Sequence, residues 1–223
     1  MNSDDSNQYV TALRFPFLTA IYDPVVKWTT RERYIKNAMI KGSSFEGGMR
    51  VLDVGCGTGT LALMLAKHRP EMEVFGIDGD KKILDIAEKK RRNQRLAVQF
   101  DYGRAEALPY EQHKFDRVFS TLFFHHLNDS QKGIVLSEIF RVLKPGGEFF
   151  LADWGNPSNM FMRCLFTIVR LLDGFENTRA NVKGELPALM KRAGFHIPST
   201  HRNINTVLGS ISLHKATKPT DAS

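Results

Sequence analysis

The segment from residue 51 to residue 59 most constrains the fold of this chain. It reads Val-Leu-Asp-Val-Gly-Cys-Gly-Thr-Gly, so a short apolar run leads into three alternating glycines. An apolar run of this length is typical of a strand buried in a parallel sheet. Glycine permits positive φ angles and lets a ligand lie against bare backbone. A helical pattern follows over Leu61 to Lys67. The motif therefore predicts an α/β fold with a ligand site at the carboxyl end of its first strand.

Strands and helices are expected to alternate around this motif. Strands are expected at 51–54, 74–77, 97–100, 115–120 and 148–152, and helices at 61–67, 83–92 and 131–143. Such alternation predicts a parallel sheet with helices on both faces and right-handed crossovers. Two further strands, at 195–197 and 206–214, have no helix between them. We expect them to pair as a hairpin, which places an antiparallel strand at one edge.

The 223 residues suit a single domain. Five segments are expected: an N-terminal helical segment or lid at 1–48, a cofactor-binding core at 49–154, a helical cap insertion at 155–184, a C-terminal helix and strands at 185–216, and a tail at 217–223. The polar start of the chain lacks the pattern of a signal peptide, and no run of roughly 18 apolar residues exists. Two cysteines fit a reducing compartment. We therefore expect a cytoplasmic protein without a membrane span.

The net charge of +7 raises the question of an anionic partner. The densest basic run, 89–95, lies at the end of a predicted helix, where the helix dipole favours positive charge. No aromatic residue interleaves with it, so base stacking is not indicated. A nucleic-acid partner is disfavoured, whereas contact with a membrane surface stays open. No metal is expected, because the two cysteines are far apart and His125 and His126 alone lack ligand spacing.

Two aspartates stand at strand ends. Asp53 lies inside the first strand, where a buried carboxylate needs a partner. That partner could be the N–H groups of the loop, or a cationic ligand through water. Asp78 ends the second strand, 21 residues after Gly57. Its two acceptor oxygens can take both hydroxyls of a ribose. The alternative is that an aspartate here caps the next helix, a role that we assign to Asp80.

Together these motifs resemble the class I S-adenosylmethionine-dependent methyltransferases. The residues that carry the resemblance are 51–59, 76–78, 105–110, 115–118, 126–127 and 141–147, in that family's order. The subgroup most similar is the small-molecule type that includes ubiquinone and menaquinone biosynthesis enzymes. The resemblance implies a Rossmann-like, doubly wound seven-stranded sheet with the last strand antiparallel. It also implies S-adenosyl-L-methionine as the cofactor and S-adenosyl-L-homocysteine as the product.

The resemblance further implies which residues hold the cofactor. Those assigned to it are Tyr22, Arg31, Asp53, Gly55, Cys56, Gly57, Gly59, Asp78, Gly79, Arg104, Ala105, Glu106 and Ser120. The glycine loop would surround the methionine part, and Tyr22 or Arg31 would reach it from an N-terminal lid. Arg104 departs from the family, in which an aspartate often accepts from the adenine amino group. Arginine has no acceptor, so Arg104 would stack on the ring, or the amino group would use a backbone carbonyl or Glu106.

A general base is needed only when the methyl acceptor carries a proton. His125, His126 and Asp153 are the candidates, because they follow or end the fourth and fifth strands. Each has a structural alternative: packing for His126, a pocket wall for His125 and a strand-end hydrogen bond for Asp153. The apolar helix at 160–172 suggests a cap over a small apolar or aromatic acceptor. A regulatory S-adenosylmethionine-binding module and an RNA methyltransferase are the alternatives, and a homodimer stays open.

Overall fold

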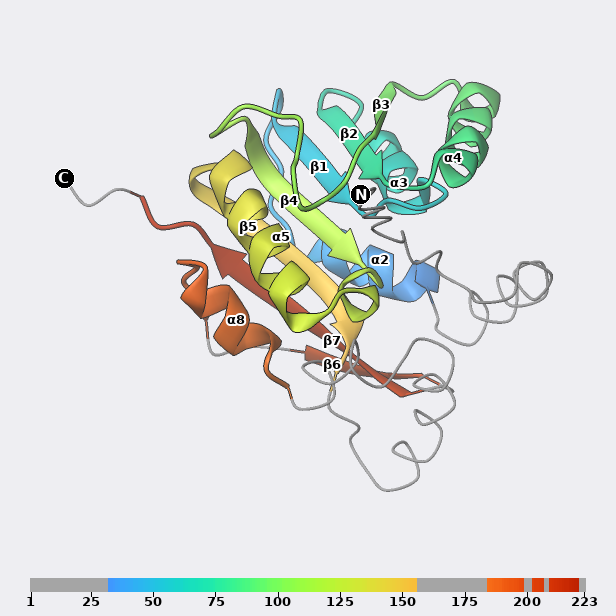
Figure 1. Ribbon diagram of the computed structural model, residues 1–223. Helices are drawn as coiled ribbons and strands as arrows, with labels where there is room; N and C mark the ends of the chain where they lie inside the picture. The colour runs from blue at the N-terminus through green and yellow to red at the C-terminus, as the bar shows by residue number, and fades with distance from the viewer. Residues whose placement is uncertain (1–31, 156–183, 199–201, 207–208, 221–223) are drawn as a thin grey trace, which may run out of the picture.

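A seven-stranded sheet forms the centre of the protein. The computed structural model describes residues 32–155, 184–198, 202–206 and 209–220 (Figure 1). The strands are β1 Arg50–Val54, β2 Glu73–Asp78, β3 Val98–Tyr102, β4 Phe115–Thr121, β5 Leu143–Trp154, β6 Arg202–Thr206 and β7 Gly209–Thr217, in the order β3-β2-β1-β4-β5-β7-β6. Strands β1 to β5 pair in parallel, and β7 is antiparallel to both β5 and β6. The predicted fold class, with its antiparallel last strand, is confirmed.

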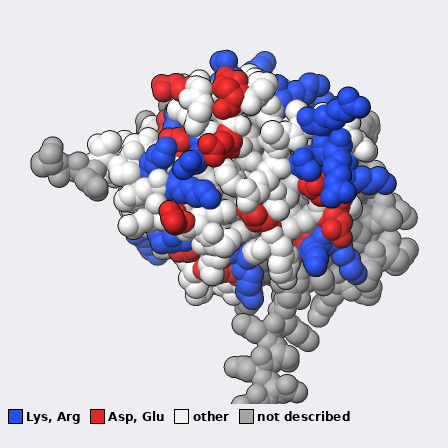
Figure 2. Space-filling model, turned by 90° about the horizontal axis from the view of Figure 1, so that it is seen from above, with Lys and Arg blue, Asp and Glu red and all other residues white. Residues whose placement is uncertain are grey.

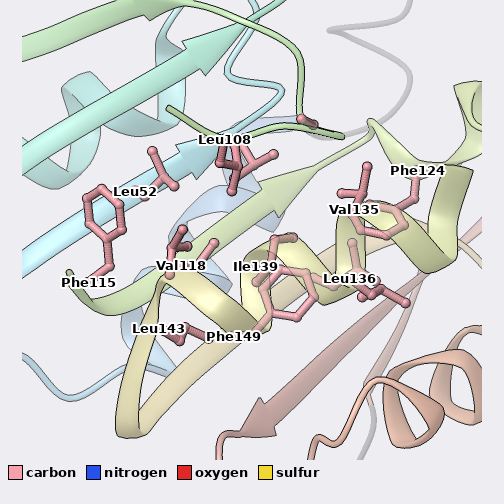
Figure 3. Close-up of a cluster of buried hydrophobic side chains, with 14 of the residues drawn as sticks. Leu52, Leu108, Phe115, Val118, Phe124, Val135, Leu136, Ile139, Leu143 and Phe149 are labelled. Carbon is pink, nitrogen blue, oxygen red and sulfur yellow. The ribbon is translucent and has the colours of Figure 1, made fainter. Parts of the chain in front are cut away.

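Helices cover both faces of this sheet. They are α2 Glu32–Lys41, α3 Thr60–His68, α4 Lys81–Gln94, the short 3-10 helix η1 Phe124–His126, α5 Asp129–Val142 and α8 Leu186–Arg192. Apolar residues of α5 and α8 pack with β1, β4 and β5 in one buried cluster, and those of α2 and α3 pack in a second cluster on the other face. Figure 3 shows Val135, Leu136 and Ile139 of α5 lying over the sheet in the first cluster. None of the described helices is long and apolar enough to cross a membrane.

Two helices near the carboxyl edge begin with side-chain caps. Asp80 accepts hydrogen bonds from the N–H groups of Lys82 and Ile83, at 2.9 and 3.3 Å, which confirms its predicted capping role. Asn128 and Gln131 form a reciprocal capping box at the start of α5. These caps fix where α4 starts after the end of β2, and where α5 starts after η1.

The predicted boundaries of the last two strands were wrong. Residues 195–197 supply only an isolated bridge between His196 and Thr217, and the run predicted at 206–214 is split between β6 and β7. β6 was not predicted because Asn203 and Asn205 are polar and interrupt the apolar pattern expected of a strand. They accept hydrogen bonds from Ser212 and Ser210 of β7 at 2.7 and 3.0 Å. Polar side chains that pair with each other across two strands stabilise a strand that has no alternating apolar pattern.

Candidate functional site

The loop after β1 is built on three glycines with positive φ. The φ angles of Gly55, Gly57 and Gly59 are 67°, 53° and 71°. A Cβ atom on Gly55 would lie 2.4 Å from the Phe123 ring, and one on Gly59 would lie 2.5 Å from the Phe100 ring. A Cβ atom on Gly57 would meet nothing closer than Ile83, at 4.0 Å. Protein packing therefore requires glycine at the outer two positions, while Gly57 leaves its backbone open to a ligand.

Asp78 fastens this loop to the end of β2. Its Oδ2 atom accepts a hydrogen bond from the N–H of Gly57 at 2.8 Å, and its Oδ1 atom accepts one from the N–H of Asp80 at 2.9 Å. Burial raises the pKa of Asp78, and these backbone hydrogen bonds act in the opposite direction. A carboxylate has about four acceptor positions, so Asp78 can hold the loop and still accept from a ligand. Gly79 lies between the two aspartates.

Asp53 lies at the end of β1 in a charged cluster that the sequence did not reveal. Its exposed fraction is 2%, and burial raises its pKa to about 7, although Lys36 and a backbone hydrogen bond with Ala62 act to lower it. The charge of Lys36 on α2, itself 6% exposed, acts on Asp53, while its Nζ donates to Glu32 at 2.5 Å. The available signal was a lysine on the same helical face as the apolar Ile35, Met39 and Ile40.

Arg104 and Glu106 pair with each other beyond the end of β3. Nη2 of Arg104 lies 3.0 Å from Oε1 of Glu106, which also accepts from Gln131 of α5 at 3.2 Å. Burial raises the pKa of Glu106, but the hydrogen bond from Arg104 and its charge outweigh burial, so the net shift is downward. Between them Ala105 is buried, at 7% exposed. The structure thus brings this predicted trio together, with Glu106 held as an ionised acceptor.

Ser120 and Cys56 occupy buried positions beside the loop. Ser120 is fully buried, and its hydroxyl donates to the carbonyl of Val54 at 2.9 Å, which joins the ends of β4 and β1. Burial raises the pKa of the Cys56 thiol well above its ordinary value, so this sulfur stays protonated. Tyr22 and Arg31, which were predicted to reach the cofactor, lie outside the described residues.

His125 and Asp153 form a hydrogen-bonded pair at the ends of β4 and β5. Nδ1 of His125 lies 2.9 Å from Oδ1 of Asp153, and the backbone N–H of His125 donates to Oδ2 at 3.2 Å. The exposed fractions are 5% for His125 and 0% for Asp153. Burial raises the pKa of Asp153, but the charge and hydrogen bond of His125 outweigh it, so the net shift is downward. The sequence predicted both residues as candidates but not their contact.

Two further titratable side chains surround this pair. The ring of His126 lies 4.0 Å from that of His125, centroid to centroid, and burial lowers its pKa to about 3. Lys132 of α5 is fully buried, and its Nζ donates to the carbonyl of Leu127 at 2.7 Å. A neutral His126 fits the structural alternative. Among the residues that the structure describes, no three His, Cys, Asp or Glu side chains gather as a metal site would.

The chain matches known methyltransferases in sequence. A family model described as a methyltransferase domain matches residues 51–147. The demethylmenaquinone methyltransferase of Lactobacillus johnsonii is 38% identical over 136 residues, which are 60% of this chain and 53% of that enzyme. The chain thus spans about half the length of that relative. An uncharacterized methyltransferase of Synechocystis, sll0829, is 34% identical over 154 residues, which are 69% of this chain and 70% of that protein.

A solved structure extends the match to the fold. The crystal structure of the PH0226 protein from Pyrococcus horikoshii OT3 has a TM-score of 0.71 and 20% sequence identity, and covers 92% of this chain and 99% of that chain. At that identity the likeness concerns the fold alone. The match to the family model covers the glycine loop, the two strand-end aspartates and the later motifs that carried the resemblance. The chain therefore belongs to the class I S-adenosylmethionine-dependent methyltransferases.

Proposed function

We propose that this protein transfers a methyl group from S-adenosylmethionine to a small acceptor molecule. One observation carries the proposal: the open backbone of Gly57 lies beside the carboxylate of Asp78, which is 2.8 Å from its N–H. An open glycine backbone suits the close approach of a ligand, and carboxylate oxygens suit ribose hydroxyls. The residues present therefore fit a nucleoside cofactor. When bound, S-adenosylmethionine supplies a methyl group already activated on a sulfonium.

The roles of the other predicted cofactor residues form part of this proposal. Those that would surround the cofactor are Tyr22, Arg31, Asp53, Gly55, Cys56, Gly59, Gly79, Arg104, Ala105, Glu106 and Ser120. The ionised Glu106 supports its assignment as an acceptor for the adenine amino group, since Arg104 is paired with it. The bond from Ser120 to Val54 supports an indirect role, in which Ser120 holds two strand ends together.

Calorimetric titration with S-adenosylhomocysteine tests the cofactor site. Asp78→Asn should weaken binding by about 30-fold or more, because it removes the charge that accepts from the ligand and exchanges one acceptor oxygen for a donor. Asp80→Asn is the matched control, since asparagine caps a helix as well as aspartate does. Equal binding by the wild type and Asp78→Asn would overturn the ribose assignment.

The acceptor is proposed to be a small aromatic hydroxyl compound such as a quinol. Support comes from the relative named demethylmenaquinone methyltransferase, which matches 60% of this chain. Methyl transfer should be measured with a panel of quinols, phenols, amines and carboxylates. Turnover on quinols or phenols is the expected result. Binding of the cofactor without turnover on any acceptor would overturn an enzymatic role and favour a regulatory module.

Peripheral contact with a membrane surface is also part of the proposal. A quinol with an apolar tail resides in a membrane, so peripheral contact with an anionic surface would bring the enzyme to it. The exposed residues Lys82, Lys89 and Arg92 of α4 support this, and Figure 2 shows Lys and Arg gathered on the side where α4 lies. Binding to phosphatidylglycerol vesicles but not phosphatidylcholine vesicles is expected, and equal binding would contradict it. The cytoplasmic location and a homodimer stay predictions from the sequence.

A further inference from the structure

The carboxylate of Asp153 fixes both the position and the proton of the His125 ring. It accepts from the backbone N–H of His125 at 3.2 Å and from the backbone N–H of Trp154 at 2.7 Å, and it lies 2.9 Å from Nδ1 of His125. An ionised carboxylate has no proton to give, so Nδ1 is the donor in this bond. The basic nitrogen of the ring is therefore Nε2.

The pair lies at the same edge of the sheet as the cofactor site, on the other side of β1. Asp78 ends β2, which pairs with one side of β1, whereas β4 and β5 lead away from the other side. Phe123, which packs directly against Gly55, is two residues before His125. The glycine loop therefore lies between the ribose carboxylate on one side and the histidine pair on the other. An acceptor that reached the glycine loop from the side of β4 and β5 would therefore come to the pair.

We infer that His125 is the catalytic base that removes a proton from the methyl acceptor, that Asp153 is its positioning residue, and that the acceptor is an aromatic hydroxyl compound. This inference rests on the proposed methyl transfer. The O–H bond of the acceptor breaks, its proton passes to Nε2 of His125, and the electron pair stays on the acceptor, which uses it to bond the methyl carbon. The bond between that carbon and the sulfonium sulfur breaks at the same time, its electron pair stays on sulfur, and S-adenosylhomocysteine is the leaving group. Asp153 stabilises the resulting imidazolium. The imidazolium then releases its proton to water, so one proton leaves the acceptor for each methyl group gained.

The neighbours of the pair come from three elements, two of which contribute titratable groups. His126 of η1 is held neutral, with its pKa lowered to about 3 by burial, so it does not compete for the proton at neutral pH. Lys132 of α5 is buried and lies 3.7 Å from Asp129 of the same helix. Its charge acts on Asp153 as well. Trp154 of β5 has its ring 6.4 Å from that of His125, edge to face. Asp153 thus acts most directly on the protonation of His125, through its contact with Nδ1.

Ionisation of a bound naphthol tests this inference without turnover. 2-Naphthol would be titrated into protein saturated with S-adenosylhomocysteine, and the absorbance of the naphtholate form followed between pH 6 and 10. The wild type should lower the apparent pKa of the bound naphthol relative to water. His125→Gln should abolish this shift and Asp153→Asn should reduce it, while His196→Gln, on the exposed surface, serves as the control. An equal shift in wild type and His125→Gln would overturn the inference, as would failure of the loaded wild type to bind the naphthol.

Calorimetry separates this inference from the proposed function. His125→Gln should bind S-adenosylhomocysteine within about twofold of the wild type, and should lose about 100-fold or more in kcat on a hydroxyl acceptor. Asp153→Asn should lower kcat by about 10- to 100-fold with little change in KM, since it misorients the base and not the acceptor. Absence of cofactor binding by the wild type would overturn the proposed function. Normal binding with an unchanged kcat in His125→Gln would overturn the catalytic base alone.

Discussion

The N–H of Gly57 donates to Oδ2 of Asp78 at 2.8 Å, although the two residues are 21 positions apart in the chain. One hydrogen bond thus joins the loop after β1 to the end of β2. Both groups are also proposed to face the cofactor, so the geometry of the loop and the position of the carboxylate depend on each other. Changes at either residue should therefore affect ligand binding more than they affect folding.

Gly57→Ala should separate binding from stability. Its Cβ meets no protein atom closer than 4.0 Å, so only the positive φ of 53° is costly, about 1–2 kcal/mol. The affinity for S-adenosylhomocysteine should fall about 10-fold or more, because the added methyl group occupies the ligand's space. Gly48→Ala is a matched control, since Gly48 also has a positive φ, 77°, and open surroundings. Calorimetry should show normal affinity for Gly48→Ala. Similar affinities for both variants would contradict close approach of the ligand to the backbone of Gly57.

Asp53→Asn should stabilise the protein more at pH 8 than at pH 5. The pKa of Asp53 is raised from 3.8 to about 7 in the folded state, so the folded chain binds more protons than the unfolded chain between these values. Stability is therefore lost as the pH rises through this window. An amide has no charge to bury. The free energy of unfolding of the variant, relative to that of the wild type, should therefore rise by about 1–3 kcal/mol between pH 5 and pH 8. Thermal unfolding of ligand-free protein at both pH values measures this, and a pH-independent difference would contradict it.

His126→Gln should make the protein more resistant to acid. The pKa of His126 is lowered from 6.5 to about 3 in the folded state, so between these values the unfolded chain binds more protons. The stability conferred by the neutral ring is present above about pH 6.5 and is lost as the pH falls toward 3. Glutamine does not titrate, so the midpoint of acid unfolding, followed by tryptophan fluorescence, should move to lower pH. The exposed His196→Gln should leave it in place, and an unchanged midpoint in His126→Gln would refute the expected effect.

Lys90→Met should weaken cofactor binding through the glycine loop. Nζ of Lys90 donates to the hydroxyl and the carbonyl of Thr58, at 2.7 and 3.2 Å, and so holds the loop from the side of α4. Loss of these bonds should cost about 1 kcal/mol, or about fivefold in affinity for S-adenosylhomocysteine. Lys89→Met removes the same charge from the exposed neighbouring position. If both variants bind equally well, the contact with Thr58 does not position the loop.

The parts of the site predicted from sequence were those set by local patterns. The strand-glycine-helix turn, the position of Asp78 at a strand end and the cap at Asp80 each depend on a few consecutive residues. The order of strands followed from their alternation with helices. These features need no knowledge of which distant segments meet.

The parts that were missed depend on contacts between distant segments. The charge of Lys36 acts on Asp53 because α2 packs its apolar face on the sheet, and a lysine on that face is expected from the sequence to reach solvent. His125 and Asp153 are 28 residues apart in the chain, so their pairing requires β4 and β5 to be neighbours in the sheet. β6 was misplaced because its polar residues are satisfied by serines on β7, and a hydrophobic pattern does not record such bonds.

The position of β7 has a consequence for how the chain reaches this structure. β7 lies between β5 and β6, so the outer edge of β5 over Glu148–Trp154 is paired only after residues 209–217 have been made. Until then a nascent chain carries an open strand edge on a strand that contributes to both buried apolar clusters, and such an edge can pair with other chains. Shielding of this edge thus comes only after β7 has been made. Ribosome-stalled chains that stop before Gly209 should therefore aggregate, whereas chains that extend past Thr217 should not.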